Sequence, residues 1–192
     1  MSVREGLTSA FKEIFQTAII SLGIFFFVYV FLVQPHKVKG NSMLPNFVDG
    51  ELLLTEKVSY HLSRPDRGEV IVFRAPTARN LDYIKRIIGL PEETIAIENG
   101  SVSINGEKLI EPYISVPTEG SVNRTLGRDE FFVLGDNRGE SSDSRSFGPI
   151  KQSSFRGKSW LVYWPILKSG PYKGFRIISG IHYSITNSLN SP

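Results

Sequence analysis

The sequence contains no cysteine, and this absence removes several classes of function at once. Without a thiol, the chain has no cysteine nucleophile, no cysteine-ligated metal and no disulfide framework. Histidine is scarce too, with only His36, His61 and His182 in 192 residues. All three lie outside the motifs described below, which gives little support to a histidine-based catalytic triad or to a metal site. We therefore expect no cofactor and no bound metal.

The chain also lacks a dominant sign of charge. Its 22 Lys and Arg residues are nearly balanced by 19 Asp and Glu residues, for a formal net charge of +3. The basic residues are interleaved with acidic ones rather than gathered in one stripe, which argues against a nucleic-acid partner. A length of 192 residues is enough for one domain of ordinary size in addition to a short N-terminal segment.

One long apolar run is present near the N-terminus. Residues 14–33 carry no charge, and a helix of about 20 residues rises about 30 Å, the thickness of a bilayer's hydrocarbon core. The run is longer than the roughly 7–15 apolar residues of a cleavable signal peptide, and residues 33–36 offer no small-x-small cleavage site. We predict a transmembrane anchor over 14–34, ended by Pro35, with residues 1–13 before it and a single domain over 35–192. The flanking basic residues are balanced, so the positive-inside rule leaves the orientation open.

The chain after the anchor predicts β structure. Residues 69–74 and 83–88 are rich in β-branched and aromatic residues, and further strands are expected at 130–134, 159–164 and near 175–178. Asn99-Gly100 and Asn105-Gly106 separate three alternating runs, which is the pattern of two tight hairpins. The fold class that we expect is mostly β, with a single-pass N-terminal transmembrane helix followed by a compact barrel-like β domain.

Ser42 and Lys85 are the residues with the clearest catalytic potential. Serine is a weak nucleophile without a base, and lysine acts as that base only when its amine is neutral near physiological pH. Because side chains alternate along a strand, Lys85 shares a face with Tyr83 and Ile87. Burial on that apolar face would lower the pKa of the amine. The alternative is a structural lysine at a sheet edge whose amine reaches water.

Four segments of the chain resemble the successive sequence boxes of bacterial type I signal peptidases. They are residues 40–45 (GNSMLP), 67–73 (RGEVIVF), 82–91 (DYIKRIIGLP) and 135–145 (GDNRGESSDSR). Their order and spacing after one N-terminal span match that family as well, from the anchor to about Trp164. The resemblance implies a membrane-anchored serine endopeptidase with a β domain of the signal peptidase type. Such an enzyme cleaves N-terminal signal peptides from exported preproteins with a Ser/Lys dyad.

The resemblance also implies roles for individual residues. Ser42 matches the nucleophile, Lys85 the general base, and Ser141 the hydroxyl that orients the lysine. The backbone N–H of Ser42 would be one oxyanion donor. Some relatives supply a second donor from a serine two residues before the nucleophile, where this chain has Gly40. We expect a backbone donor near Gly40 or an ordered water to take its place.

Substrate contacts follow from the same resemblance. The family prefers small residues, typically Ala, at the first and third positions before the cut. Val38, Met43 and Ile84 would line the shallow pockets that receive them. Tyr83 and the backbone around Ile84 would pair with the extended substrate by strand addition. For the apolar side chains, plain core packing is the alternative.

Two ion pairs are expected to brace the site, by the same resemblance. They join Arg86 to Asp136 and Asp143 to Arg145, and their alternative is a set of solvated surface charges. Many relatives have Asp-Asn after Gly-Asp-Asn-Arg, where this chain has Gly139-Glu140. We therefore expect the local geometry of this loop to differ from theirs.

The resemblance places the N-terminus in the cytoplasm and the catalytic domain on the outer face of the cytoplasmic membrane. The partners implied are signal-peptide-bearing preproteins and the lipid bilayer. The sequence leaves a thylakoid or organelle membrane open. The alternative function is a catalytically inactive, signal-peptidase-like membrane binding module, which would require a broken dyad. A soluble self-cleaving repressor with the same dyad would carry a DNA-binding helical module in place of the apolar run.

Overall fold

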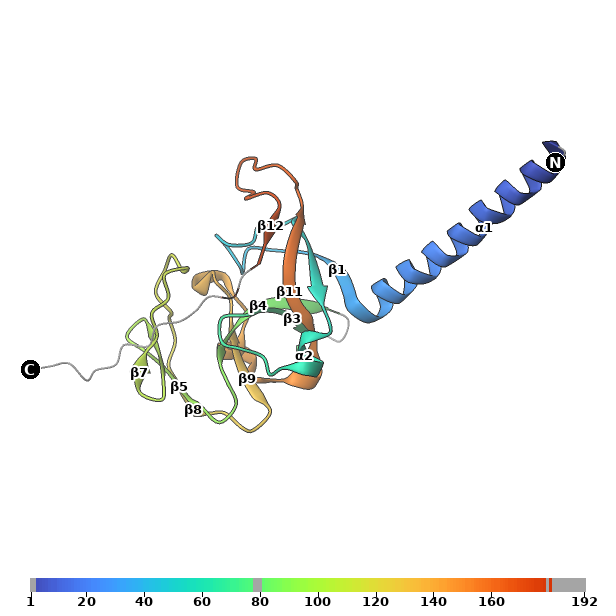
Figure 1. The fold of residues 1–192 in the computed structure, drawn as a ribbon. Helices are drawn as coiled ribbons and strands as arrows, with labels where there is room; N and C mark the ends of the chain where they lie inside the picture. The colour runs from blue at the N-terminus through green and yellow to red at the C-terminus, as the bar shows by residue number, and fades with distance from the viewer. Residues whose placement is uncertain (1–2, 78–80, 179, 181–192) are drawn as a thin grey trace, which may run out of the picture.

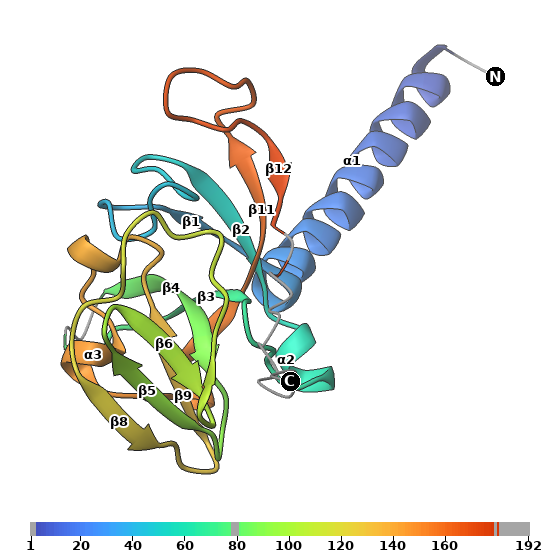
Figure 2. The same cartoon turned by 90° about the vertical axis from the view of Figure 1, so that its left-hand side faces the viewer.

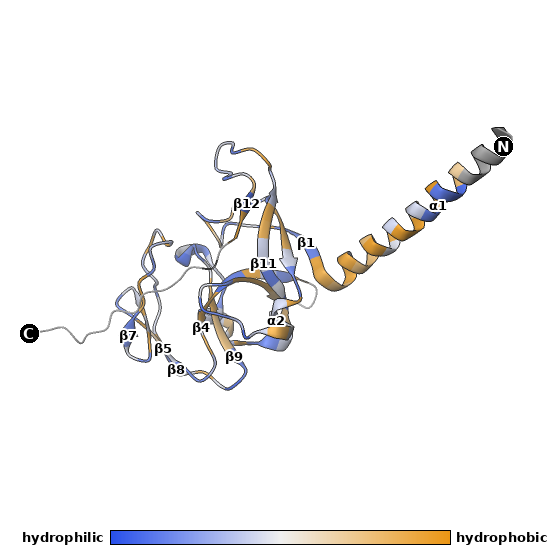
Figure 3. Ribbon diagram, in the orientation of Figure 1, coloured by the Kyte–Doolittle hydropathy of each residue, from blue (hydrophilic) through white to orange (hydrophobic). Residues whose placement is uncertain are grey.

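A long N-terminal helix leads into a β domain. In this computed structural model, residues 3–77, 81–178 and 180 are described, so His182 lies outside them. Helix α1 (Val3–Phe27) continues as the π-helical segment η1 (Val28–Leu32). Within it, Ala10–Leu32 is long and apolar enough to cross a membrane, and none of it is buried against the domain. Figures 1 and 3 show this helix projecting from the domain with its hydrophobic part nearest to it.

The helix ends two residues before the boundary expected from the sequence. Val33 and Gln34 belong to β1 (Val33–Lys37), which pairs antiparallel with β2 (Leu52–Glu56). Pro35 also lies in β1, opposite Leu54. A residue before proline disfavours the helical conformation, and proline fits an edge strand because its missing N–H faces away from the ladder. Pro35 is therefore part of the strand that follows the helix, and it prevents the helix from continuing.

The larger sheet contains most of the strands that the structure describes. Its order is β1-β2-β11-β3-β4-β9-β10, with β12 paired to β11, and every pairing is antiparallel. Figure 1 shows this sheet curling round the centre of the domain. The remaining strands are β3 (Val70–Arg74), β4 (Asp82–Gly89), β9 (Glu130–Leu134), β10 (Ile150–Lys151), β11 (Phe155–Trp164) and β12 (Arg176–Ile177). Short helical segments between strands are α2 (Ser59–Leu62), η2 (Arg138–Glu140), α3 (Ser144–Phe147) and η3 (Gln152–Ser154).

A second sheet lies on the side of the domain away from α1, as Figures 1 and 2 show. Its order is β7-β6-β5-β8, from β5 (Thr94–Glu98), β6 (Ser101–Ile104), β7 (Glu107–Lys108) and β8 (Val122–Thr125). Both predicted hairpins are confirmed, with positive φ at Asn99 (51°), Gly100 (76°), Asn105 (53°) and Gly106 (86°). Asparagine and glycine tolerate that conformation, which gives the turn the twist of the flanking strands.

The mostly β fold class is confirmed, and the strands that the sequence missed have physical explanations. β1 contains a proline, β2 reads Leu-Leu-Leu-Thr-Glu without alternation, and β8 is a largely exposed edge. Each lacks the alternating apolar pattern on which a strand prediction depends. Their pairing partners in the sheets, rather than local preference, make them strands.

Buried apolar clusters fill the domain, and one of them holds the segment that contains Ser42. Met43 and Phe47, which follow Ser42, are among the buried members of this cluster. Its other buried members are Val38, Leu53, Val70, Val72 and Val162. The turn around Ser42 is thus fastened to the sheet through the side chains on either side of it.

Close backbone packing between β11 and β2 predicts a stability effect at Gly157. A Cβ atom there would lie under 3.0 Å from the Glu56 carbonyl oxygen, which is backbone and cannot turn away. We expect Gly157→Ala to lower the free energy of unfolding by about 1–3 kcal/mol, as overpacking does. Thermal unfolding of the detergent-solubilised protein, followed by far-UV circular dichroism, measures this change. Gly127→Ala is the matched control, because its Cβ would meet only the Glu130 side chain, at 3.4–3.5 Å. Equal melting temperatures for the two variants would contradict the predicted clash.

Candidate active site

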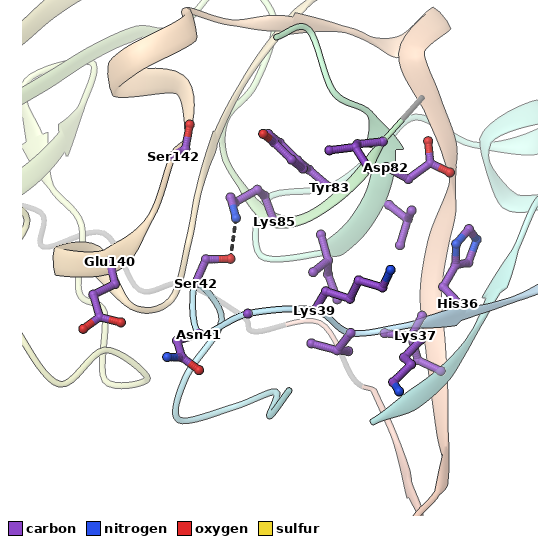
Figure 4. A pocket seen from close by; sticks show the side chains of 16 residues that line it. His36, Lys37, Lys39, Asn41, Ser42, Asp82, Tyr83, Lys85, Glu140 and Ser142 are labelled. Carbon is purple, nitrogen blue, oxygen red and sulfur yellow. Dashed lines mark hydrogen bonds between the residues drawn. The ribbon is translucent and has the colours of Figure 1, made fainter. Parts of the chain in front are cut away.

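The structure brings Ser42 and Lys85 into direct contact. Lys85 Nζ donates a hydrogen bond to Ser42 Oγ at 2.6 Å, although 43 positions separate them in the chain. Figure 4 shows the two side chains pointing toward each other in a pocket, with a dashed line for this hydrogen bond. Ser42 lies in the turn that follows β1, and Lys85 lies in the middle of β4. A neutral amine in this position could instead accept the serine proton.

Burial lowers the pKa of Lys85 toward neutral pH. Only 3% of the residue is exposed, and desolvation lowers its pKa from 10.5 to about 8. The carboxylates of Asp143 and Asp136 oppose this shift, and the Arg145 guanidinium adds to it. A substantial fraction of the amine is therefore neutral at mildly alkaline pH.

The alternation of side chains along β4 explains the burial. Ile87, two residues after Lys85, is fully buried, and Tyr83, two residues before it, packs against the same apolar cluster. The Lys85 amine lies 5.7 Å from the centre of the Tyr83 ring. The apolar face expected from the sequence therefore surrounds the lysine in the structure.

Backbone hydrogen bonds clamp the turn that presents Ser42. The Ser42 carbonyl accepts from the Asn137 N–H at 3.0 Å, and Asn137 Nδ2 donates to the Asn41 carbonyl at 3.1 Å. On the other side, the Gly40 N–H donates to Asp49 Oδ1 at 2.7 Å. Sequence reasoning missed this function of Asn137, although the residue stands inside one of the four motifs.

Ser141 lies beside this turn but does not bond to Lys85. Its Oγ is buried and has no hydrogen-bond partner among the described residues. A Cβ atom added at Gly135 would lie under 3.0 Å from Ser141 Oγ and from the Ser42 carbonyl oxygen, so only glycine fits between them. The expected hydrogen bond to the lysine is absent, and the amine bonds to Ser42 Oγ.

Arg86 and Asp136 form the first of the two expected ion pairs. Arg86 Nε and Nη2 donate to the two carboxylate oxygens of Asp136 at 2.8 and 2.6 Å, and both side chains are buried. Asp136 also accepts from Asn46 Nδ2 at 2.9 Å. A bidentate pair of this kind fixes orientation as well as distance.

Asp143 and Arg145 form the second pair. Arg145 Nε and Nη2 each lie 2.9 Å from an Asp143 oxygen, and the Asp143 carboxylate is fully buried. Asp143 also accepts from the Gly135 N–H at 3.1 Å. This carboxylate therefore fixes the backbone at Gly135, which packs against the Ser42 carbonyl oxygen and Ser141 Oγ.

A third buried cation, Arg138, was not recognised from the sequence. Its guanidinium bonds both oxygens of Glu111, at 2.6 and 2.9 Å, and contacts the Thr118 hydroxyl. Its Nε donates to the Gly135 carbonyl at 3.0 Å. Glu111 and Thr118 come from the segment between β7 and β8, so Arg138 ties the second sheet to the site. No sequence motif links them.

A groove of about 480 Å³ extends from Ser42 and Lys85 between β1 and β4. In β4 only Arg86–Gly89 pair with β9, and β1 pairs with β2 alone, so among the described strands both present free backbone edges toward this groove. Val38, Tyr83 and Ile84 line it. Met43 is not among the lining residues; it is 1% exposed and packs in a buried apolar cluster. Its assignment to a substrate pocket is therefore corrected.

Over the described residues, no group of three or more His, Asp or Glu side chains is placed to hold a metal ion. Within the groove, the Ser42 hydroxyl and the Lys85 amine are the nucleophile and base that lie in direct contact.

Comparison with known proteins finds consistent matches. A family model described as signal peptidase, peptidase S26, matches residues 11–164. A protein named signal peptidase I from Leptolyngbya laminosa is 36% identical over 172 residues, covering 85% of this chain and 83% of that protein. Signal peptidase IB from Staphylococcus aureus (strain COL) is 33% identical over 176 residues, covering 80% and 91%. A crystal structure of a signal peptidase I from Enterococcus faecalis V583 is 33% identical, covers 50% of this chain and 97% of that one, and has a TM-score of 0.46.

The buried amine predicts a titration that an exposed lysine would not show. We expect the Lys85 resonance in ¹³C-lysine NMR spectra of the solubilised protein to titrate near pH 8, well below 10.5. Lys85→Met identifies the resonance by removing it. The unfolded chain binds the Lys85 proton up to pH 10.5, so the wild type should gain stability relative to Lys85→Met as the pH rises from 8 to 10.5. Titration near 10.5 would show that the amine is solvated.

Proposed function

The chain belongs to the signal peptidase family, peptidase S26, and on this premise we propose that it cleaves N-terminal signal peptides from exported preproteins with a Ser42/Lys85 dyad. The observation that carries the proposal is the 2.6 Å contact between the serine hydroxyl and a buried lysine amine. This is the pairing of nucleophile and base that serine-based peptide hydrolysis requires. The contact is intact, which disfavours the alternative of an inactive membrane binding module.

The reaction follows from the two groups in contact. Neutral Lys85 Nζ accepts the hydroxyl proton as Ser42 Oγ forms a bond to the scissile carbonyl carbon, and the carbonyl electron pair moves onto oxygen. When the tetrahedral intermediate collapses, the C–N bond breaks and the Lys85 ammonium protonates the leaving amine. Water then attacks the acyl-enzyme carbonyl as Lys85 accepts one of its protons. The C–Oγ ester bond breaks, the Lys85 ammonium returns the proton to Ser42 Oγ, and the signal peptide leaves as a carboxylic acid that ionises.

The Ser42 N–H is the oxyanion donor that we assign. It belongs to the turn clamped by Asn137, so its direction is set before substrate binds. The Gly40 N–H already bonds to Asp49 and is therefore not free to serve as the second donor. We assign that position to a bound water.

Positioning functions complete the site. Ser141 keeps the proposed role of orienting the lysine: although it does not bond to Lys85 in this structure, its Oγ is buried and unpaired among the described residues, so it can accept a hydrogen bond from the amine. The pairs Arg86–Asp136 and Asp143–Arg145 hold the backbone under Ser42 and Ser141. Each pair is internally neutral, which limits how strongly the two carboxylates hold the Lys85 proton.

The groove is suited to an extended peptide. The free edges of β1 and of residues 82–85 can both hydrogen-bond to a substrate added as a strand, with Tyr83 and Ile84 supplying one side. Alternate substrate side chains would then point toward the groove floor, where Val38 and Ile84 leave room for small residues at the first and third positions before the cut.

The membrane arrangement that we propose has residues 1–13 in the cytoplasm, an anchor over 14–34 and the peptidase domain over 35–192 on the outer face of the cytoplasmic membrane. An apolar helix that is not buried against the domain supports the anchor. Val38, in the groove wall, is only six residues after the end of that helix at Leu32. The cut would therefore be made close to the bilayer, where a preprotein emerges.

Loss of either dyad member should abolish cleavage. A preprotein carrying Ala-x-Ala is incubated with the detergent-solubilised full chain, and mass spectrometry identifies the products. Ser42→Ala lacks the nucleophile, and Lys85→Arg keeps a cation that cannot lose its proton, so neither should yield product. Lys151→Arg, an exposed lysine on β10, should cleave normally. Processing by Ser42→Ala would refute the proposed function.

The pH dependence of kcat/KM for the wild type should reflect the titration of the Lys85 amine. Because only the neutral amine is active, kcat/KM should rise about tenfold per pH unit below pH 8 and level off above it. An acidic limb near pH 6 would indicate that another group accepts the serine proton.

Substrate size at the last position before the cut tests the groove. Replacing Ala with Phe there should lower kcat/KM by about 100-fold or more, because the side chain must clash with the floor or open it. The same replacement one residue earlier serves as the control, since that side chain points away from the floor and should be tolerated. Equal losses at both positions would contradict the orientation of the bound peptide.

A further inference from the structure

The end of the groove distant from Ser42 is polar. Val38, Ile84, Leu53 and Val72 make its middle apolar, whereas His36 and Asp82 stand at the far end. Figure 4 shows these two side chains together, on the opposite side of the pocket from Ser42 and Lys85. Small apolar residues near the cut do not account for polar groups at this distance.

Strand geometry relates the polar pair to the apolar one. His36 is two residues before Val38, and Asp82 is two residues before Ile84, so each polar residue shares a face with its apolar counterpart. Two residues of extended chain advance by about 6.6–6.8 Å, whether the chain is β1, β4 or a bound peptide. A peptide whose third residue before the cut lies at Val38 and Ile84 therefore brings its fifth to His36 and Asp82.

Both polar groups have bonding capacity for a ligand. His36 Nε2 is shielded from water and has no hydrogen-bond partner within the described part of the chain. Burial lowers the pKa of the imidazole, so the ring is neutral at physiological pH and has one donor and one acceptor nitrogen. His36 is one of the residues that line the groove. Asp82 accepts from Arg156 Nε at 3.2 Å through Oδ1, and a carboxylate can accept further hydrogen bonds.

We propose that His36 and Asp82 form a subsite for the fifth substrate residue before the cut, and that it prefers an uncharged hydrogen-bonding side chain over an aliphatic one. This inference rests on the proposed function. A hydroxyl or amide can both donate and accept, so it can bond to Asp82 and to either tautomer of His36, whereas an aliphatic side chain leaves His36 Nε2 without a partner. Arg156, Lys37 and Lys39 near this end disfavour a cationic side chain, and Asp82 disfavours a carboxylate.

Threonine and valine, which have nearly the same shape, test the preference. We compare kcat/KM for two Ala-x-Ala peptides that differ only in Thr or Val at the fifth position before the cut. The wild type should favour Thr by about fivefold, the effect of one net hydrogen bond. The same exchange at the fourth position, whose side chain points away from the floor, should change kcat/KM little.

Variants of His36 and Asp82 test whether these residues cause the preference for Thr over Val. In His36→Phe and in Asp82→Leu the Thr/Val ratio should fall toward one, and this ratio within each variant is unaffected by any general loss of rate. Gln34→Leu, two residues further along β1 and outside the groove, should keep the wild-type ratio. Equal cleavage of the two peptides by the wild type, or a ratio unchanged in both groove variants, would overturn the subsite while leaving the proposed function intact. Failure to cut either peptide would overturn the proposed function itself.

Discussion

The burial of one lysine amine against one serine hydroxyl is the constraint on which the rest of this structure depends. Lowering the pKa of Lys85 from 10.5 to about 8 corresponds to roughly 3 kcal/mol of folding free energy lost at neutral pH. The remaining core must offset that loss, and the apolar cluster on the Lys85 face of β4 provides part of it. The same desolvation leaves part of the amine neutral, which is what a general base requires.

The charges around the dyad follow from this constraint. Asp136 and Asp143 fix the backbone of the site, yet each carboxylate also raises the pKa of the nearby amine. Pairing Asp136 with Arg86 and Asp143 with Arg145 keeps the bracing hydrogen bonds while cancelling much of the negative potential. Breaking either pair would leave an uncompensated buried charge, so these arginines matter both to the fold and to the state of Lys85.

The short segment of residues 33–40 connects the anchor to the groove. Residues 33–40 leave the apolar helix, form the edge strand β1 and become one wall of the groove before the chain turns at Ser42. An unpaired strand edge is normally a liability for aggregation. Here the free edges of β1 and β4 face each other across the groove, where an added peptide strand would satisfy both.

The sequence by itself determined the features that depend on local pattern. The apolar run predicted the N-terminal helix, the Asn-Gly pairs predicted both hairpins, and alternation predicted that Lys85 shares the face of Ile87. The motifs predicted which charges would pair. Only the tertiary structure decided that Met43 belongs to the core, that Gly40 donates to Asp49, and that Arg138 joins the second sheet to the site. It also left Ser141 Oγ unpaired among the described residues. The reason is physical: periodicity sets which way a side chain points within its own strand, whereas contacts between distant residues depend on how the sheet curls and what space remains between its strands.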